Sequence, residues 1–416
     1  MNKSIYFLFL LFTFYSNAQT KILFDATKAE MAGNADWVID ADAHNIWFSS
    51  TTHLPYTNGT GGASNPQRVP SPAQSGITAT TPETFWEGGL SNFAIDCVNQ
   101  GYIVESLPYN GAITYGNSAN AQDLSNYKVF VVDEPNSSFT ATEKAALVNF
   151  VANGGGLMMI CDHTISDRNN DGVDSPMVWN DFMTNNTVQN NPFGITFDLL
   201  NISGNSSTIA NLPTNLILHG SHGNVTQVLW SNGTTMTLNV ANNSTVRGLI
   251  YKSGSSTTGT TNVMVASASY QQGKVVAIGD SSVPDDGTGD TGDVLYNGYT
   301  GDANGNHQKL LMNAMVWLAT PTLSNSEFDA NAMQFSIAPN PVQGKELHFN
   351  FTTNTDAPVT LFIYDTLGRI IKTATYKSIY TENNLKTLPI DNLVSGIYIG
   401  KLSNEEQSKS IRFIVK

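Results

Sequence analysis

The sequence has few cysteines and few charged residues for its length. Cys97 and Cys161 are the only two cysteines among 416 residues, which excludes a disulfide framework and leaves either one bridge or two buried thiols. Charged residues make up 13% of the chain, about half of the usual ~25%. Asparagine, serine, threonine and glycine must therefore carry much of the surface, which suits an exported protein better than a cytosolic one.

Basic residues are the scarcer of the two charged types. The chain has 20 Lys and Arg against 34 Asp and Glu, for a net charge of −14. The imbalance is concentrated between residues 19 and 332, which hold ten bases and 27 acids. Without a basic patch to neutralise phosphates, nucleic-acid binding and docking to an anionic membrane are excluded as main functions.

The sequence also lacks an apolar run long enough for a stable transmembrane anchor. A membrane-spanning helix needs about 18–20 apolar residues, and the apolar run at residues 5–15 is shorter. Lys3 precedes this run and Ser16-Asn17-Ala18 follows it, which is the order of a cleavable export signal. Residues 1–18 are therefore predicted to be a signal peptide.

Strand and helix patterns alternate in the middle of the chain. Apolar runs predict strands at about 21–26, 102–108, 128–133, 157–161, 262–269 and 274–280, and helices are predicted at about 82–100, 140–153 and 307–319. Pro82 at a first helical position and the capping box of Thr140 and Glu143 mark two of the helix starts. This order predicts an α/β domain over residues 19–320 with a doubly wound, mostly parallel sheet.

Polar residues follow several of the predicted strands. Ligands of such sheets bind beyond the carboxyl ends of the strands, where acids and an imidazole can perform acid–base chemistry. The candidate catalytic residues are Asp162, His163, Asp280 and Cys161, and the candidate substrate-binding residues at strand ends are Asp25, Asp133 and Glu134. Each acid taken singly is also explained by the turn that follows a strand.

Three segments carry a resemblance to a known family. Val131 to Pro135, the glycines at 154–156 and the stretch from Gly273 to Ser282 resemble the class I glutamine amidotransferase-like superfamily. The nearest branches are its trehalose-utilisation (ThuA-like) and gliding proteins, over about 21–320. The resemblance implies a flavodoxin-like, glutamine amidotransferase-like fold with Cys161 at the place of the nucleophile.

The same resemblance departs from the amidotransferase pattern around that cysteine. Family members with a nucleophilic cysteine have glycines two positions before and after it, whereas this chain has Met159 and His163. A strained nucleophile elbow is therefore not expected. A thiol amidase acting through Cys161 is kept as a third hypothesis.

Two short motifs have the spacing of metal ligands. Asp167, Asn169 and Asp171 before Gly172 match the first half of an EF-hand loop, which predicts calcium. Position twelve is Val178 rather than glutamate, so Asp174 or Asp181 would have to complete the ligand set. A hydrated turn rich in Asp and Asn is the alternative.

The second motif alternates acids and a histidine. Asp40, Asp42 and His44 would project to one side of an extended segment, as ligands for a second divalent metal. A solvated turn is the alternative. A metal shared with Asp162 and His163 would require both segments to reach the same rim.

Residues 45–81 lack an apolar period and predict a lid or binding loop above the crevice. Trp47 and Arg68 are its candidate substrate-binding residues. Exposed tryptophans there, together with Trp86 and Trp179, would suit stacking on sugar rings. Packing of these side chains into the core is the alternative.

The last part of the chain changes in character. A polar linker is predicted at 321–332, and short alternating strands with a mildly basic composition follow over 333–416. Pro339-Asn340-Pro341, Asp365 to Arg369, Leu393 to Tyr398 and a terminal strand that bears lysine resemble the type A sorting domain of the type IX secretion system. A generic carbohydrate-binding sandwich is the alternative for this small antiparallel β-sandwich.

The sorting resemblance implies export through the periplasm to the outer cell surface or the medium, with the type IX machinery as a partner. Proteins that follow this route are frequently polymer-degrading enzymes. We therefore expect a secreted, metal-supported hydrolase of an extracellular polymer, with glycan favoured and His163 or a metal-bound water as base or nucleophile. The alternative is a non-catalytic, calcium-stabilised surface binding or adhesion protein.

Overall fold

The computed structural model describes residues 19–40, 48–53, 73–206, 208–289, 296–302, 305–321, 333–353, 356–378, 384–404 and 408–416. The predicted signal peptide, nearly all of the predicted linker, and Asp42, His44, Trp47 and Arg68 lie outside these ranges. The chain divides into two compact units, Met1–Thr322 and Leu323–Lys416. Each unit is described by itself.

Buried parallel strands form one half of a ten-stranded sheet in the first unit. Their order is β2-β1-β3-β4-β14, with neighbours parallel throughout. The strands are β1 (Lys21–Asp25), β2 (Ile103–Leu107), β3 (Val129–Asp133), β4 (Gly156–Ile160) and β14 (Gly273–Ile278). Each lies within a residue or two of its predicted range. Their near-continuous apolar sequences match a sheet that is covered on both faces.

The other half of the sheet corrects the prediction of a mostly parallel sheet. After β14 the order continues β13-β11-β5, and β12 and β7 join from β13, with antiparallel pairing between all these neighbours. These strands are β5 (Ile195–Phe197), β7 (Thr208–Ile209), β11 (Met236–Leu238), β12 (Arg247–Tyr251) and β13 (Val263–Tyr270). The two-residue turn Gln271-Gln272, with Gln271 at φ 50°, makes β13 and β14 a hairpin, which must be antiparallel.

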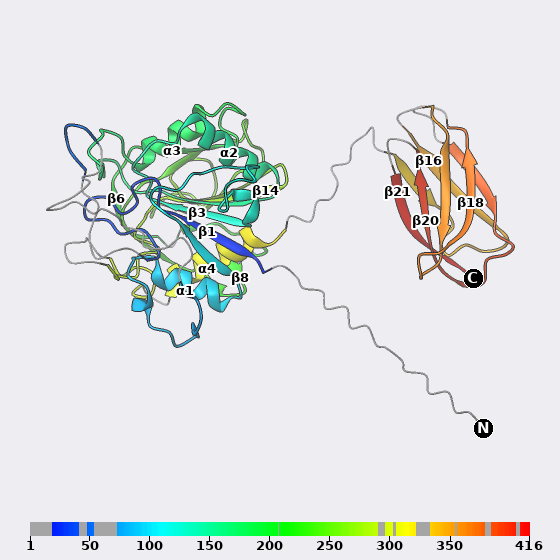
Figure 1. Ribbon diagram of the computed structural model, residues 1–416, viewed down its shortest axis with the longest axis horizontal. Coiled ribbons are helices and arrows are strands. Elements are labelled where there is room, and N and C mark those ends of the chain that lie inside the picture. The colour runs from blue at the N-terminus through cyan, green and yellow to red at the C-terminus, as the bar shows by residue number, and fades with distance from the viewer. Residues whose placement is uncertain are drawn as a thin grey trace, which may run out of the picture. The chain divides into compact units, whose positions relative to one another are not determined.

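Helices lie on both faces of the sheet. In Figure 1, α2 (Ala141–Ala152) and α3 (Ser175–Thr184) lie on one side and α1 (Ser91–Asn99) and α4 (Asn306–Ala319) on the other. The capping box of Thr140 and Glu143 is present at the start of α2. Short 3₁₀ turns occupy Glu83–Phe85 (η1) and Leu124–Asn126 (η2).

The predicted helix at 82–100 begins later than expected. Residues 88–90 are drawn instead into contact with the segment at 36–39, because the N–H groups of Gly88 and Leu90 donate to Ile39 O and Val38 O. A Cβ on Gly88 would lie 2.1 Å from Val38 O. This close approach of two backbones prevents a helix before Ser91.

The stretch at 162–261 has more regular structure than its sequence predicted. Besides α3 and the strands of the large sheet, β6 (Ile202–Ser206) pairs with β10 (Val228–Gly233), and β8 (His219–Gly220) pairs with β9 (Gly223–Asn224). Cys97 and Cys161 are both buried and free, so the alternative of a bridge between them does not hold. Among the described residues, no helix is long and apolar enough to cross a bilayer.

The second unit is all-β, as predicted. One antiparallel sheet has the order β15-β16-β19 and the other β18-β17-β20-β21. The strands are β15 (Gln334–Ile337), β16 (Glu346–Thr352), β17 (Val359–Tyr364), β18 (Ile370–Tyr376), β19 (Asn384–Pro389), β20 (Gly396–Ser403) and β21 (Ser408–Val415). Alternate residues such as Leu347, Phe349, Leu361 and Phe413 form a core of its own, which is typical of a unit that folds independently.

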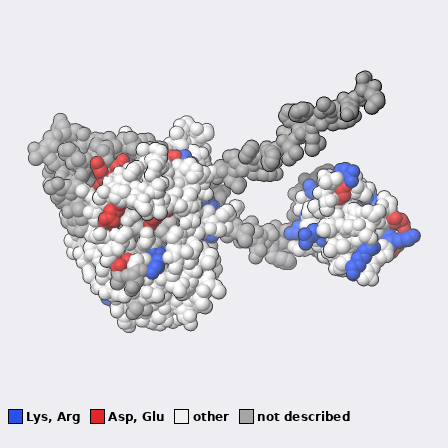
Figure 2. Space-filling view, turned by 90° about the horizontal axis from the view of Figure 1, so that it is seen from below, with Lys and Arg blue, Asp and Glu red and all other residues white. Residues whose placement is uncertain are grey.

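The two units differ in surface charge. Figure 2 shows one face of each unit: acidic groups outnumber basic ones on the α/β unit, while Lys and Arg are frequent on the β unit. This agrees with the counts in the sequence. In the acidic α/β unit, the few buried Lys and Arg side chains are therefore important for compensating the charge of buried acids.

Candidate functional site

Four acids gather at the carboxyl ends of three adjacent parallel strands. Asp133 ends β3 and is followed by Glu134, Asp162 lies two residues after β4, and Asp280 lies two residues after β14. Because β3, β4 and β14 are neighbours in the sheet, these ends meet at one edge. Each of the four side chains is at most 2% exposed. The structure thus brings together the strand-end acids that the sequence singled out, with the exception of Asp25.

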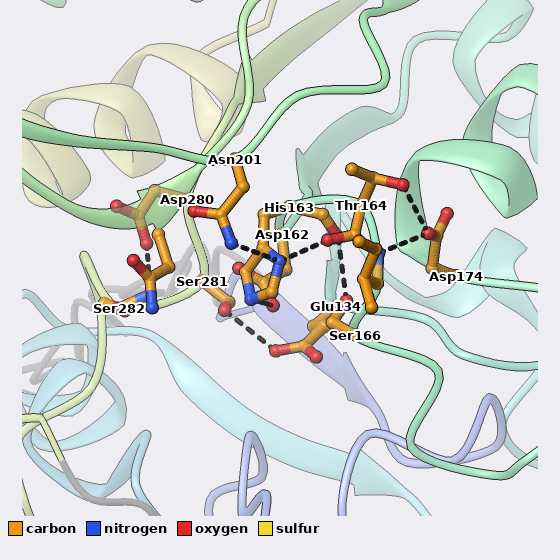
Figure 3. Close-up of polar contacts among 12 residues, drawn as sticks. Glu134, Asp162, His163, Thr164, Ser166, Asp174, Asn201, Asp280, Ser281 and Ser282 are labelled. Atoms are coloured by element: carbon orange, nitrogen blue, oxygen red, sulfur yellow. Dashed lines mark hydrogen bonds and ion pairs between the residues drawn. The ribbon is translucent and has the colours of Figure 1, made fainter.

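Glu134 is the centre of the hydrogen-bond network at this edge. Its carboxylate accepts from Ser281 Oγ at 2.8 Å (Figure 3). It also accepts from Arg168 Nε at 2.6 Å and from Trp37 Nε1. Its backbone has φ 43°, a conformation that residues other than glycine adopt mainly at sites where the surroundings enforce it. Here Glu134 N donates to Ile160 O at 3.1 Å. The strand end is therefore held rigidly in one geometry.

Arg168 is the cation of this network, and the sequence interpretation missed it. Besides Glu134, its guanidinium faces Asp162 Oδ2 at 3.6 Å and donates to Asn34 Oδ1 at 2.9 Å. Burial lowers the pKa of Arg168, but the charges of Glu134 and Asp162 outweigh burial and raise it. Arg168 is one of only ten bases between residues 19 and 332, and that scarcity was the available signal. Arg168 lies between Asp167 and Asn169, two residues of the predicted calcium motif.

Burial is the largest influence on the pKa values of the acids around Glu134. It raises the pKa of Asp133 and of Asp162 well above the ordinary range, and the charge of Glu134 adds to both shifts. Burial likewise raises the pKa of Asp280 to about 7, although the N–H groups of Ser282 and Ser231 partly stabilise its carboxylate. Neither carboxyl oxygen of Asp133 has a hydrogen-bond partner among the described residues. Burial and the neighbouring carboxylates therefore favour the neutral form of Asp133.

His163 reaches solvent at this edge, as Arg168 also does, and each side chain is 16% exposed. His163 Nε2 lies 3.5 Å from Asp162 Oδ2. On the other side of the ring, a protonated Nδ1 can donate to Thr164 O, and an unprotonated Nδ1 can accept from Asn201 Nδ2 at 3.0 Å. Nδ1 therefore has a hydrogen-bond partner in either neutral tautomer of the imidazole.

Cys161 and Ser281 are poorly placed as nucleophiles. Both side chains are buried, and the Ser281 hydroxyl is committed to Glu134. Burial raises the pKa of the Cys161 thiol well above its usual range, and Sγ donates to Asp162 O at 3.2 Å. Since the thiolate is the reactive form of cysteine, this environment argues against the thiol amidase.

Asp25 lies at the end of β1 but interacts with a different set of residues. Its carboxylate accepts from Thr27 N at 3.0 Å. Burial raises its pKa, and the charge of Lys28 partly opposes that rise. Glu30 is its acidic neighbour, and the pKa of Glu30 is also raised by burial and then by the charge of Asp25. Asp25 therefore belongs to a second acidic pair rather than to the network around Glu134.

The predicted calcium loop is closed by its own hydrogen bonds. Asp167 accepts from Asp171 N at 3.0 Å and from Gly172 N at 2.7 Å, and Asn169 Nδ2 donates to Asp171. The acids expected to complete the ligand set are engaged elsewhere: Asp174 caps α3 and Asp181 pairs with Lys144 on α2. Calcium binding by this loop stays a prediction.

The second predicted metal site is described only in part. Asp40 is buried and accepts from Glu87 N at 3.3 Å, while Asp42 and His44 lie outside the described residues. Within the described ranges, no three or more His, Cys, Asp or Glu side chains converge as a metal-binding group. The second divalent metal also stays a prediction.

The tryptophans expected to stack on sugars are buried. Trp86 and Trp179 belong to the main core, and Trp179 Nε1 donates to Ile160 O at 3.0 Å. Of the two interpretations of these tryptophans, packing into the core is therefore confirmed, and stacking on sugars does not hold for Trp86 and Trp179.

Comparison with known proteins identifies the C-terminal unit. Residues 336–416 match the family described as the secretion system C-terminal sorting domain. These residues are a sorting domain of the type IX secretion system. The protein is therefore exported, to the cell surface or the medium, and the type IX machinery is its partner in that step. The carbohydrate-binding alternative for this unit is set aside.

Other comparisons are too remote to support an argument. The mmIFT52 N-terminal domain is 13% identical, with 59% of this chain and 96% of that chain covered and a TM-score of 0.38. PorZ, a surface component of the type IX secretion system of Porphyromonas gingivalis, is 20% identical over 22% of this chain and 12% of that chain, with a TM-score of 0.15. Lactobacillus rhamnosus β-glucuronidase is 22% identical over 20% of this chain and 15% of that chain, with a TM-score of 0.13. No curated protein matches, and the amidotransferase-like resemblance stays a prediction.

Removal of the sorting domain is expected to block export without unfolding the α/β unit. A chain that stops at residue 332 keeps the whole α/β core, because the two units have separate cores. Cell fractionation should find this chain in the periplasm with unchanged tryptophan fluorescence, since all six tryptophans precede residue 320. Surface display of the shortened chain at the full-length level would contradict the expectation.

Proposed function

We propose that the α/β unit is an extracellular hydrolase whose site is centred on His163. The observation that carries this proposal is the position of His163. It is partly exposed and lies beside the buried Asp162, which faces Arg168, and Arg168 in turn contacts Glu134, the acceptor of Ser281, at the carboxyl edge of the parallel strands. Export by the sorting domain places that site where extracellular polymers are available.

In the proposed reaction, His163 acts as general base toward water. Nε2 is the proton acceptor, and the Nε2–H of the imidazolium that forms faces Asp162 Oδ2 at 3.5 Å. Arg168 holds Asp162 and Glu134 in place. Asp280 accepts from Ser282 N and Ser231 N, and so positions Ser281 against Glu134. No bound metal is needed for these steps, and calcium at the loop of Asp167 would act on stability.

Substitution of His163 tests the proposal directly. His163→Gln is expected to lower turnover at least about 100-fold, the usual contribution of a general base, with an unchanged thermal midpoint. The matched control is His219→Gln on β8, where the ring contacts Asn224 away from the site. Purified wild type and variants would be assayed for hydrolysis of soluble glycans, proteins and esters. Full activity of His163→Gln, or no turnover of any substrate by the wild type, would refute it.

A non-catalytic surface binding protein is the second candidate. The observation that favours it is the enclosure of Asp133, Glu134, Asp162 and Asp280, which suits acids that hold a fold as well as acids that react. In that case the purified protein binds an insoluble extracellular polymer in sedimentation assays without releasing product. His163→Gln would then bind as well as the wild type.

A further inference from the structure

Ile165 has a backbone conformation that its side chain disfavours. Its φ is 70°, in the left-handed region, where β-branched residues are true outliers. Burial does not explain the strain, since Ile165 is 87% exposed. Glycine or asparagine would adopt this conformation more readily. A strained residue with an exposed apolar side chain is typical of a functional position.

The surrounding hydrogen bonds enforce that conformation. Asp174 Oδ2 accepts from Ile165 N at 2.8 Å and from Thr164 Oγ1 at 3.0 Å, while Asp174 also caps α3. On the other side, Thr164 N donates to Leu200 O at 3.0 Å. The backbone at Ile165 is therefore held in place by hydrogen bonds on both sides.

The segment around Ile165 lies directly at the candidate site. Ile165 is two residues from His163, and the segment at 199–201 contacts the same stretch through Leu200 O and through Asn201 Nδ2, which reaches the imidazole. Leu199 and Leu200 are 55% and 41% exposed. Three exposed aliphatic side chains thus belong to the two segments that flank the imidazole.

We infer that Ile165, with Leu199 and Leu200, determines substrate specificity by contacting an aliphatic group beside the cleaved bond. The substrate class that fits is an extended polypeptide with aliphatic side chains. Sugars are bound mainly through polar contacts and aromatic faces, whereas Trp86 and Trp179 are buried. This inference rests on the hydrolase proposed above.

The reaction implied is amide hydrolysis. His163 takes a proton from water while the water oxygen bonds to the carbonyl carbon. The C–N bond then breaks, and the imidazolium returns its proton to the leaving amine. The products are a carboxylate and a protonated amine, with no oxidant or further reactant.

The test uses quenched fluorescent peptides that carry either aliphatic or small polar residues beside the cleaved bond. Ile165→Asn is expected to raise KM for the aliphatic peptides at least about tenfold, as losses of apolar contact do, with kcat largely retained. It is also expected to raise the thermal midpoint by about 2–4 °C as strain is relieved. Ile165→Val should lose less affinity, and Leu216→Asn, at an exposed apolar position away from the site, should lose none.

Several outcomes would overturn the inference while leaving the hydrolase intact. These are equal kcat/KM for aliphatic and polar peptides, an unchanged KM in Ile165→Asn, or cleavage of glycans alone. Absence of any turnover would instead overturn the hydrolase. In that case peptide binding to the wild type and to Ile165→Asn, followed by fluorescence anisotropy, still decides whether Ile165 recognises aliphatic groups.

Discussion

Arg168→Met is expected to lower the free energy of unfolding of the α/β unit by about 3–5 kcal/mol, as removal of one partner of a buried ion pair does. The guanidinium contacts Glu134 at 2.6 Å and Asp162 at 3.6 Å, and both acids are buried. Without Arg168, the carboxyl groups of Glu134 and Asp162 remain buried and lose the guanidinium that faces both of them. In the unfolded chain, water solvates these carboxyl groups. The substitution therefore raises the free energy of the folded state and leaves that of the unfolded state nearly unchanged.

Urea unfolding of the mature full-length chain measures this effect. All six tryptophans lie before residue 320, so their fluorescence reports on the α/β unit alone. Arg247→Met, at an exposed position on β12, is the matched control and should change stability by less than about 0.5 kcal/mol.

A double variant separates charge compensation from side-chain packing. Arg168→Met with Glu134→Gln should recover part of the loss, because the second change removes one of the uncompensated charges. A loss below about 1 kcal/mol for Arg168→Met, or no recovery in the double variant, would show that Arg168 does not compensate these acids.

The second large effect expected is a fall in stability as pH rises from about 4 to about 8. Burial raises the pKa of Asp280 to about 7 and that of Asp286 to about 6, above the 3.8 of an unperturbed aspartate. Between these values the folded state binds more protons than the unfolded state. The stability contributed by the protonated acids is therefore complete below about pH 4 and is lost as pH rises through the folded pKa. Asp280 alone accounts for about 4 kcal/mol across this window.

Groups with lowered pKa values act in two directions. Burial lowers the pKa of His307 below its usual 6.5, so its contribution to stability rises with pH up to about 6.5 and partly opposes the trend. The pKa of Asp181 is lowered because its hydrogen bond to Lys144 outweighs the effect of burial. The contribution of Asp181 is present above the unfolded pKa and is lost only as pH falls below about 4. Urea unfolding by tryptophan fluorescence between pH 4.5 and 8.5 therefore excludes the change from Asp181 and reports the raised acids together with His307.

Asp133→Asn should flatten this pH dependence. Asparagine is close in shape to the neutral acid and cannot ionise, and neither oxygen of Asp133 has a hydrogen-bond partner among the described residues. The variant should equal the wild type near pH 4 and gain on it as pH rises. Asp181→Asn, the control, should instead lose stability at neutral pH. A wild-type stability that rises steadily from pH 4.5 to 8.5 would contradict the assignment.

Local patterns were sufficient for part of the fold. The strands β1, β3, β4 and β14 are continuous apolar runs, and the capping box at Thr140 is complete in the sequence. The motifs of the sorting domain are contiguous and ordered, so they could be recognised without coordinates. In each case the signal is contained in short contiguous stretches of the sequence.

Other features depend on contacts between distant segments. The pairing of β13 with β14 follows from a Gln-Gln turn that carries no strong turn signal, so the antiparallel half of the sheet was not predicted. The late start of α1 depends on the segment at 36–39. Burial of Trp86 and Trp179 likewise depends on neighbours that the local pattern does not reveal.

The sequence by itself determined the export route, the α/β order and the acids at the strand ends, because these follow from local pattern and from the rule that ligands bind at the carboxyl edge of parallel strands. Only the tertiary structure decided which acids share an environment, that Arg168 compensates them, and that Ile165 is strained beside His163. The physical reason is that burial and charge pairing depend on distance in space. Asp133, Asp162, Arg168 and Asp280 become neighbours only when three strands align.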